Sequence, residues 1–311
     1  MKRIPTLAIC TLMIIFTLCS CGVNTADNGK INVVCTVFAP YDFVRQIAGD
    51  KVNLRMLLPP GSEAHDYDPR PNDITDIQKA NLFIMIGGES EEWASRLTEE
   101  HIISETNIVR LIDRIDTVEE EHTDGMQETG GHHHEAETDE HVWTSPENAI
   151  TMVQTICDAL CRADSENSAV YRANTKDYIA ELEKLGSDMK QISENSKHKE
   201  IIVADRFPFR YLADYMNIKY FAAFPGCAAQ TEPAPSTVAF LIDKTRNDNI
   251  PVVFGVDYSR HKIADAVCDE TGANVRTLYS CHNVSKKQFD SGETYIGLMR
   301  HNEKVLREAL N

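Results

Sequence analysis

Positively charged residues are scarce in this sequence. Its 311 residues include 31 Lys and Arg against 48 Asp and Glu, which gives a formal net charge of −17 at pH 7. Proteins that bind nucleic acid depend on Lys and Arg to neutralise phosphates. The charge balance therefore argues against a nucleic-acid partner, whereas an acidic surface is compatible with cationic ligands.

A long hydrophobic run is also absent. The apolar segment from Leu7 to Leu18 is shorter than the roughly 20 residues that a membrane-spanning helix needs. It follows Lys2 and Arg3, and this order is typical of a secretion signal. Its last residues, LCSC, resemble the bacterial lipobox, in which the signal is cut before a cysteine that then carries lipid.

These features predict a lipoprotein that lies outside the cytoplasm and touches the membrane only through its lipid anchor. We expect a signal peptide at 1–20, a lipidated Cys21 as the first mature residue and a flexible tether at 21–30. The alternative is an ordinary cleaved signal with a cysteine beside it by chance.

Signatures of secreted hydrolases are missing as well. The sequence contains no HExxH helix and no G-x-S-x-G elbow, and no carboxylate is obviously placed as a general base. A secreted zinc hydrolase, in which three protein ligands leave one open position for water, stays open as an alternative. The prediction is that the protein is not an enzyme.

Nine cysteines are present, and their spacing suggests no small disulfide-stapled scaffold. Cys10 and Cys19 leave with the signal, and Cys21 is the predicted lipid carrier. The other six permit three disulfides, but a chain of this length folds without them, and we interpret most of them as buried free thiols. These six are Cys35, Cys157, Cys161, Cys227, Cys268 and Cys281.

Short β-rich runs alternate with helical patterns along the whole chain. Strands are predicted at 31–38, 52–58, 82–88, 200–204, 218–224, 250–256 and 274–280. Such alternation is typical of parallel sheets covered by helices. A further helix is predicted from the Ser145 cap and Pro146 to about Cys161.

One helix is much longer than the others. From 166 to 197 the chain has Gly186 as its sole glycine or proline, and apolar residues recur at steps of three, four and seven. A helix of that length exceeds what one lobe needs. The fold class is therefore α/β, with a first lobe at 31–165, a rigid inter-lobe helix at 166–197 and a second lobe at 198–311.

The segment 119–140 differs in kind from the rest of the first lobe. It holds nine acids, four histidines and no Lys or Arg. Because it has almost nothing apolar to bury, we expect a mobile loop. Clustered neutral imidazoles would make it a weak auxiliary zinc collector through His122, His132, His133 and His134.

Potential metal ligands follow several predicted strands at the edge where ligands bind in open α/β sheets. His65 follows the strand at 52–58, Asp205 follows 200–204, and Cys281 and His282 follow 274–280. His141 lies at the end of the acidic segment, just before the helix capped by Ser145. Each could instead be a loop or core residue, but together they predict a cleft between the lobes.

Two histidine motifs resemble a known family. PPGSEAHDYDPRPNDI resembles the PPG-x-x-x-HDYEPSP-x-DI segment of the zinc- and manganese-binding ZnuA/TroA proteins of ABC importers, and DEHVWTSPENA resembles their DPHVWLDP-x-NA. The closing GETYIGLMRHNEKVLREAL is similar to their last helix. The resemblance implies two α/β lobes with one metal ion between them, and a permease and its ATPase as partners.

The family's ligand positions fall on His65 and His141 without strain. The third falls on Arg206, whose guanidinium cannot accept a metal, so its neighbour Asp205 is the candidate. The fourth falls on Cys281, with His282 beside it. Two His, Asp205 and either Cys281 or His282 would suit Zn²⁺, and the softer Cys and His donors argue against Mn²⁺. An importer component for Mn²⁺ or Fe²⁺ stays open as an alternative.

Overall fold

A computed structural model describes residues 29–99, 108–127, 138–228 and 232–311 of the chain. Residues 31–311 form one compact unit, which does not include the N-terminal residues. The predicted signal peptide, the lipidation site Cys21 and most of the predicted tether lie outside the described residues, as do His132, His133 and His134.

The first lobe contains a four-stranded parallel sheet in the order β2-β1-β3-β4. Its strands are β1 (Asn32–Cys35), β2 (Asn53–Met56), β3 (Leu82–Met85) and β4 (Ile108–Arg110). Its helices are α1 (Phe38–Ala48), α2 (Pro71–Lys79), α3 (Glu92–Glu99) and α4 (Pro146–Ala163). Ser145 caps α4 through its side chain, as the sequence predicts, whereas β4 has no predicted counterpart.

The second lobe repeats this plan with the strand order β6-β5-β7-β8, again all parallel. Its strands are β5 (Glu200–Phe207), β6 (Lys219–Pro225), β7 (Val252–Val256) and β8 (Asn274–Leu278). Its helices are α6 (Arg210–Met216), α7 (Pro235–Asn247), α8 (Lys262–Thr271), α9 (Lys286–Asp290) and α10 (Tyr295–Leu310). The predicted α/β fold class is confirmed.

Helices cover the sheets, which explains the composition of the central strands. Every residue of β3 and of β7 is buried, so these strands are continuous apolar runs rather than alternating ones. Because the strands in each lobe are parallel, their carboxyl ends lie at one edge of each sheet. The loops that carry the candidate ligands leave from these edges.

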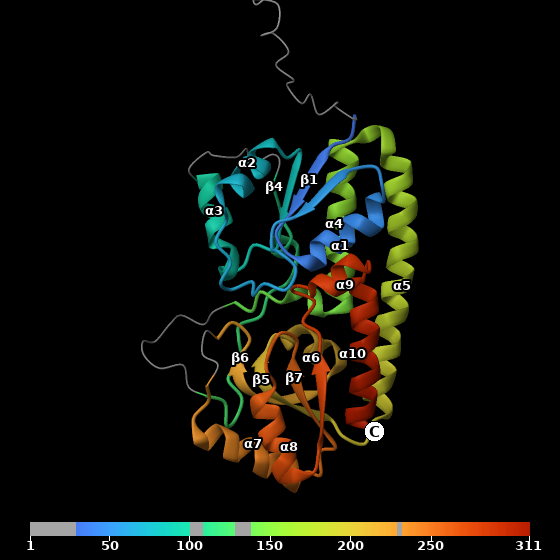
Figure 1. The fold of residues 1–311 in the computed structure, drawn as a ribbon. Coiled ribbons are helices and arrows are strands. Elements are labelled where there is room, and N and C mark those ends of the chain that lie inside the picture. Colours follow the sequence, from blue (N-terminus) through green and yellow to red (C-terminus); the bar gives the residue numbers. More distant parts are fainter. Residues whose placement is uncertain (1–28, 100–107, 128–137, 229–231) are drawn as a thin grey trace, which may run out of the picture. The chain divides into compact units, whose positions relative to one another are not determined.

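The long helix α5 (Ser168–Asn195) has 28 residues and would extend about 42 Å at 1.5 Å per residue. It contacts α1 and α4 of the first lobe and α6 and α10 of the second. Figure 1 shows α5 running beside both sheets. The predicted helix at 166–197 is therefore present with slightly shorter ends. Its buried stripe contains Tyr171, Tyr178, Leu182, Leu185, Met189 and Ile192.

The acidic segment is not a solvated loop at its two ends. Glu119 forms an isolated antiparallel bridge with Thr138. The amide of Gln127 donates to the carbonyl of Ala223 over 2.9 Å, and Arg210 forms an ion pair with Glu121. The two ends of the segment, 119–127 and 138–140, form an acidic stem that hydrogen bonds hold against the second lobe, which composition did not predict. The mobility expected for the whole segment stays a prediction. His122 is exposed on this stem.

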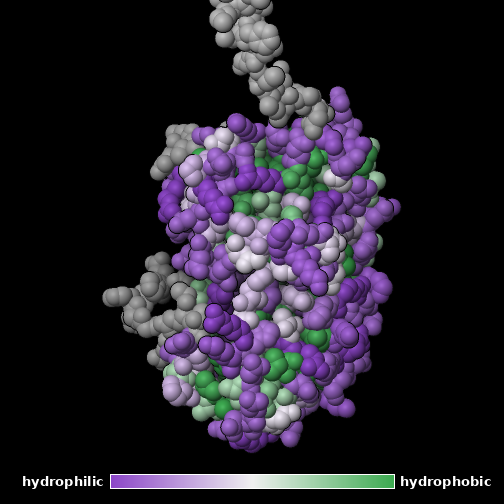
Figure 2. All heavy atoms as spheres, in the orientation of Figure 1, coloured by the Kyte–Doolittle hydropathy of each residue, from purple (hydrophilic) through white to green (hydrophobic). Residues whose placement is uncertain are grey.

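The face of the molecule in Figure 2 is largely hydrophilic. Among the described residues, the exposed large apolar side chains are Val170 and Tyr258. No helix in the described ranges combines the length and apolarity that crossing a membrane requires.

The six cysteines of this part of the chain are free thiols, and four of them are buried.

Gly186 allows α5 to approach two other helices closely. A Cβ at this position would lie 2.3 Å from the hydroxyl oxygen of Tyr215 and 3.2 Å from Cβ of Pro146. We expect Gly186→Ala to lower the free energy of unfolding by about 1–2 kcal/mol, because overpacking exceeds the gain in helix propensity. Ser187→Ala, at an exposed neighbouring position, is the control and should be neutral or slightly stabilising. Thermal denaturation of both variants checks this; equal stabilisation by the two changes would contradict it.

Candidate metal centre

Three imidazoles from distant parts of the chain meet at the junction of the lobes. His65 follows β2, His141 precedes α4, and His282 follows β8. Their ring centroids are 6.0 Å apart for His65 and His141, and 5.6 Å apart for each of the pairs with His282. One nitrogen of each ring lies within 4.8 Å of the others, a spacing that would allow one ion to be shared.

The loop that carries His65 is held by the loop that carries His282. The side-chain amide of Asn283 donates to the carbonyls of Pro59 and Ser62 over 2.9 and 2.8 Å. The amide of Gly61 donates to the carbonyl of Val284 over 2.8 Å. Each of these bonds joins the two lobes beside the imidazole cluster.

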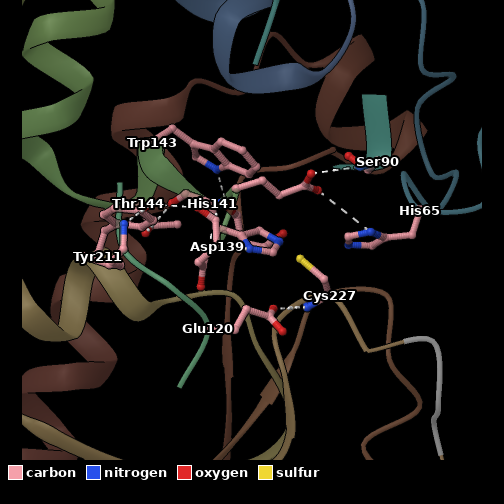
Figure 3. A network of polar contacts seen from close by, with 12 residues as sticks. His65, Ser90, Glu120, Asp139, His141, Trp143, Thr144, Tyr211 and Cys227 are labelled. Atoms are coloured by element: carbon pink, nitrogen blue, oxygen red, sulfur yellow. Dashed lines mark hydrogen bonds and ion pairs between the residues drawn. The ribbon is translucent and has the colours of Figure 1, made fainter. Parts of the chain in front are cut away.

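His141 is fixed from behind by a carboxylate. Oδ1 of Asp139 accepts the His141 amide at 2.8 Å and lies 3.0 Å from Nδ1 of the ring. With Nδ1 engaged in this way, Nε2 is the nitrogen left for the cluster, and a carboxylate on the far nitrogen is a common support for a metal-binding histidine. Figure 3 shows Asp139 beside the ring. Both residues are almost completely buried.

His282 is positioned by the turn after β8. Its amide donates to Oγ of Ser280 over 3.2 Å, and its carbonyl accepts the Phe38 amide over 3.0 Å. Trp143 closes the back of the cluster, with its ring centroid 4.8 Å from that of His282. The indole N–H of Trp143 donates to the Ser280 carbonyl over 2.8 Å, so the motif around His141 is tied directly to this turn.

The three rings differ in their affinity for protons. Burial, together with the neighbouring His141 and Arg206, lowers the pKa of His65. Burial lowers the pKa of His282 well below its usual value, and the other two imidazoles lower it further. Burial also acts to lower the pKa of His141, but Asp139 and Glu140 outweigh it, and the net shift is upward. His65 and His282 are therefore neutral at pH 7, which is the state that binds metal.

The imidazoles of His65, His141 and His282 line a pocket of about 30 Å³. This space accommodates a water molecule or a single ion. Pockets for organic ligands are roughly ten times larger or more. The arrangement is therefore suited to one small cation.

Arg206 also lines this pocket, at the position where the resembled family has a ligand. Its guanidinium donates to Oε2 of Glu63 over 3.0 Å, which joins the end of β5 to the loop that carries His65. A permanently protonated group cannot bind a cation. Of the four candidate positions in the second lobe, Asp205, Arg206, Cys281 and His282, only His282 belongs to the imidazole cluster.

Two residues predicted as ligands have other roles. The carboxylate of Asp205 accepts the amides of Arg206 at 2.9 Å and Val256 at 3.3 Å, so it joins the carboxyl-terminal part of β5 to the end of β7. Cys281 is fully buried in the main hydrophobic core with φ at 58°. Neither belongs to a cluster of three potential ligand atoms in the described part of the chain. The residue after Cys281 lines the pocket instead, and its side chain is the imidazole of His282.

A second cluster, which sequence reasoning missed, adjoins the first. It consists of Glu140, His141 and Cys227, whose potential ligand atoms also lie within 4.8 Å of one another. Glu140 is 2% exposed, and its Oε1 lies 3.9 Å from Nδ1 of His65. Burial and the nearby Glu140 and Glu120 raise the pKa of the Cys227 thiol. The only signal for Glu140 in the sequence is its position next to His141.

Comparison with known proteins connects this geometry to a family. The family model described as "Zinc-uptake complex component A periplasmic" matches residues 33–309. The chain is 30% identical to the high-affinity zinc uptake system protein ZnuA of Bacillus subtilis, over 98% of this chain and 96% of that protein. It is 28% identical to the zinc-binding lipoprotein AdcA of Streptococcus pneumoniae over 99% of its own length, but it spans only 61% of AdcA.

Solved structures share the fold. The metal-dependent lipoprotein YcdH of Bacillus subtilis superposes with a TM-score of 0.76 at 29% identity, covering 90% of this chain and 99% of that one. The Zn(II)-bound ZnuA-like domain of Streptococcus pneumoniae AdcA gives a TM-score of 0.74 at 25% identity, covering 91% of this chain and 99% of that domain. The two-lobe architecture is thus that of known metal-binding proteins.

Glu91, a buried residue near this site, makes the free energy of unfolding depend on pH. Its carboxylate accepts the Gly87 amide at 2.7 Å, and burial, with a smaller contribution from Glu140, raises its pKa to about 7. Because its folded-state pKa exceeds the unfolded value, stability should fall by up to about 3 kcal/mol as pH rises from about 4.5 through 7. Glu91→Gln should remove this loss, whereas the exposed Glu92→Gln should retain it. Denaturation of metal-free protein at about pH 5.5 and 8 checks this, and identical pH profiles for wild type and Glu91→Gln would contradict it.

Proposed function

We propose, from the premise that the chain belongs to the family of periplasmic zinc-uptake components, that it captures Zn²⁺ outside the cytoplasm and delivers it to an ABC permease driven by a cytoplasmic ATPase. One observation carries the proposal. Three imidazoles from both lobes face a pocket sized for a single ion.

The ligand set favours zinc over harder cations. His65, His141 and His282 would supply three nitrogen donors, and Zn²⁺ binds imidazole in tetrahedral sites. Mn²⁺ prefers carboxylate, carbonyl and water oxygen, so an imidazole-rich pocket selects against it. The names of the relatives from Bacillus subtilis and Streptococcus pneumoniae, which refer to zinc, support the same choice.

Hydrogen bonds within the protein hold the three rings in the cluster. Asp139 orients His141, the turn at Ser280 orients His282, and Asn283 holds the loop of His65. A preorganised cage loses little conformational freedom on binding, which favours tight capture from a dilute supply. Release to the permease would require that at least one of these loops moves away from the others.

A zinc hydrolase is the less favoured reading. A hydrolase needs an open coordination position for water and room for an organic substrate. The pocket has a volume of only about 30 Å³, and the Arg206–Glu63 ion pair lies at its edge. Purified protein that binds one zinc equivalent tightly but turns over no ester, peptide or phosphate would agree with transport.

Two further parts of the proposal rest on residues outside the described ranges. The lipid anchor at Cys21 would keep the protein near the permease. The histidines at 132–134, with His122 on the stem, would collect zinc transiently and raise its local concentration. Both stay predictions from the sequence. Deleting 128–137 should slow zinc loading under scarcity while the tight site remains.

Removing one ring at a time tests the ligand set. His65→Ala, His141→Ala and His282→Ala should each weaken Zn²⁺ binding at least about 100-fold, because each removes one of the three imidazole donors that hold the ion most tightly. Competition titration against a fluorescent chelator measures the affinity.

Asp205→Asn and Cys281→Ala are the matched controls, since the sequence places both at the same sheet edge but the structure keeps them out of the cluster. Circular dichroism of each variant confirms that it is folded. A His282→Ala protein that binds zinc as tightly as the wild type, or an Asp205→Asn protein that loses binding, would overturn this assignment.

A further inference from the structure

Cys227 differs from the other described cysteines in its surroundings. Cys35, Cys157, Cys161 and Cys281 belong to the main hydrophobic core, and Cys268 packs against a second apolar cluster. A buried free cysteine usually acts as such a small apolar residue. Cys227 belongs to none of the hydrophobic clusters formed by the described residues. Apolar packing therefore does not explain its position.

The chain around Cys227 is held so that the sulfur reaches the pocket. Its amide donates to Oε1 of Glu120 over 2.7 Å. The preceding Gly226 lets the backbone pass close to the first lobe, since a Cβ there would lie 3.3 Å from Cε1 of His141 and 3.0 Å from the carbonyl of Phe207. Figure 3 shows the Cys227 sulfur pointing toward the His141 ring.

Glu140 supplies an independent observation that points to a cation ligand at this place. Its Oε2 accepts the Ser90 amide at 3.0 Å, but its Oε1 is fully buried and has no hydrogen-bond partner. Buried carboxylate oxygens are almost always paired. The carboxylate is also backed closely, because a Cβ at Gly88 would lie 2.2 Å from Oε2. It is fixed, and its Oε1 faces Nδ1 of His65 at 3.9 Å, beyond hydrogen-bond distance.

We propose that Glu140, His141 and Cys227 form a second Zn²⁺ position, which shares His141 with the three-imidazole position. This inference rests on the proposed function, because it concerns the same ion. Nε2 of His141 binds one ion at a time, so the two positions are alternatives for a single Zn²⁺. Five donors thus surround an ion that takes four, and binding at the second position releases the thiol proton to solvent.

The second position allows the ion to pass from one donor of the second lobe to another. In the three-imidazole position the second lobe contributes His282, and in the second position it contributes Cys227. The ion can therefore exchange one donor of the second lobe for another while His141 keeps hold of it. A stepwise exchange avoids the large cost of removing a bare dication from all of its ligands at once.

Co²⁺ is a direct probe, because a cobalt–thiolate bond gives an intense charge-transfer band in the near ultraviolet, whereas tetrahedral cobalt gives weaker bands in the visible. Metal-free full-length mature protein would be titrated with Co²⁺ alone. We expect both sets of bands in the wild type and in Cys268→Ser, a half-buried control on α8. In Cys227→Ser the near-ultraviolet band should disappear while the visible bands persist.

A measurement on the unaltered chain guards against misfolding of the variant. One equivalent of Zn²⁺ should slow alkylation of Cys227 at least about tenfold and leave Cys268 unaffected, because metal-bound sulfur is a poor nucleophile and Cys268 has no metal position nearby. Peptide mass spectrometry distinguishes the two cysteines.

The outcomes separate the two proposals. Visible bands without a near-ultraviolet band in the wild type, or equal alkylation of Cys227 with and without Zn²⁺, would overturn the thiolate position and leave the imidazole site standing. Failure to bind Co²⁺ or Zn²⁺ at all would overturn the proposed function and, with it, this inference.

Discussion

The site depends on the hydrogen bonds that join the loop after β2 to the loop after β8. Asn283 reaches across the lobe boundary to the carbonyls of Pro59 and Ser62, and Gly61 returns a bond to Val284. These bonds set the separation of His65 from His282 to a value that one ion can bridge. Without them, each lobe would retain its sheet but offer too few donors to hold a cation, since tetrahedral zinc needs about four.

The two motifs around His65 and His141 and the alternation of strands and helices made the fold predictable. Parallel sheets bury both faces, so their strands appear in sequence as apolar runs, and a helix of 28 residues leaves an unbroken periodic stripe. The location of the site at the carboxyl ends of the strands followed from the same logic. His65 and His141 could therefore be placed together before any coordinates were considered.

The other members of the two clusters could not be found in this way, because their positions depend on turns and tertiary contacts. Cys281 has a left-handed backbone conformation, and its side chain lies in the hydrophobic core, whereas that of the next residue, His282, lines the pocket. Glu140 and Cys227 meet because the acidic stem docks on the second lobe, where Glu120 accepts the Cys227 amide. The polar composition of that stem predicts a solvated loop, whereas long-range hydrogen bonds hold it against the second lobe.

The continuous helix α5 limits how this molecule can open. A wide hinge between the lobes would have to bend or break a helix that packs on both of them, and the main-chain hydrogen bonds of such a helix resist sharp kinks. The flexibility that opening requires must then lie in the short loops around the pocket. In such a protein the lobes keep their relative position while the loops around the pocket move. The rate of metal exchange then depends on the fluctuations of these loops, and the selectivity for a metal depends on the side chains that the loops carry.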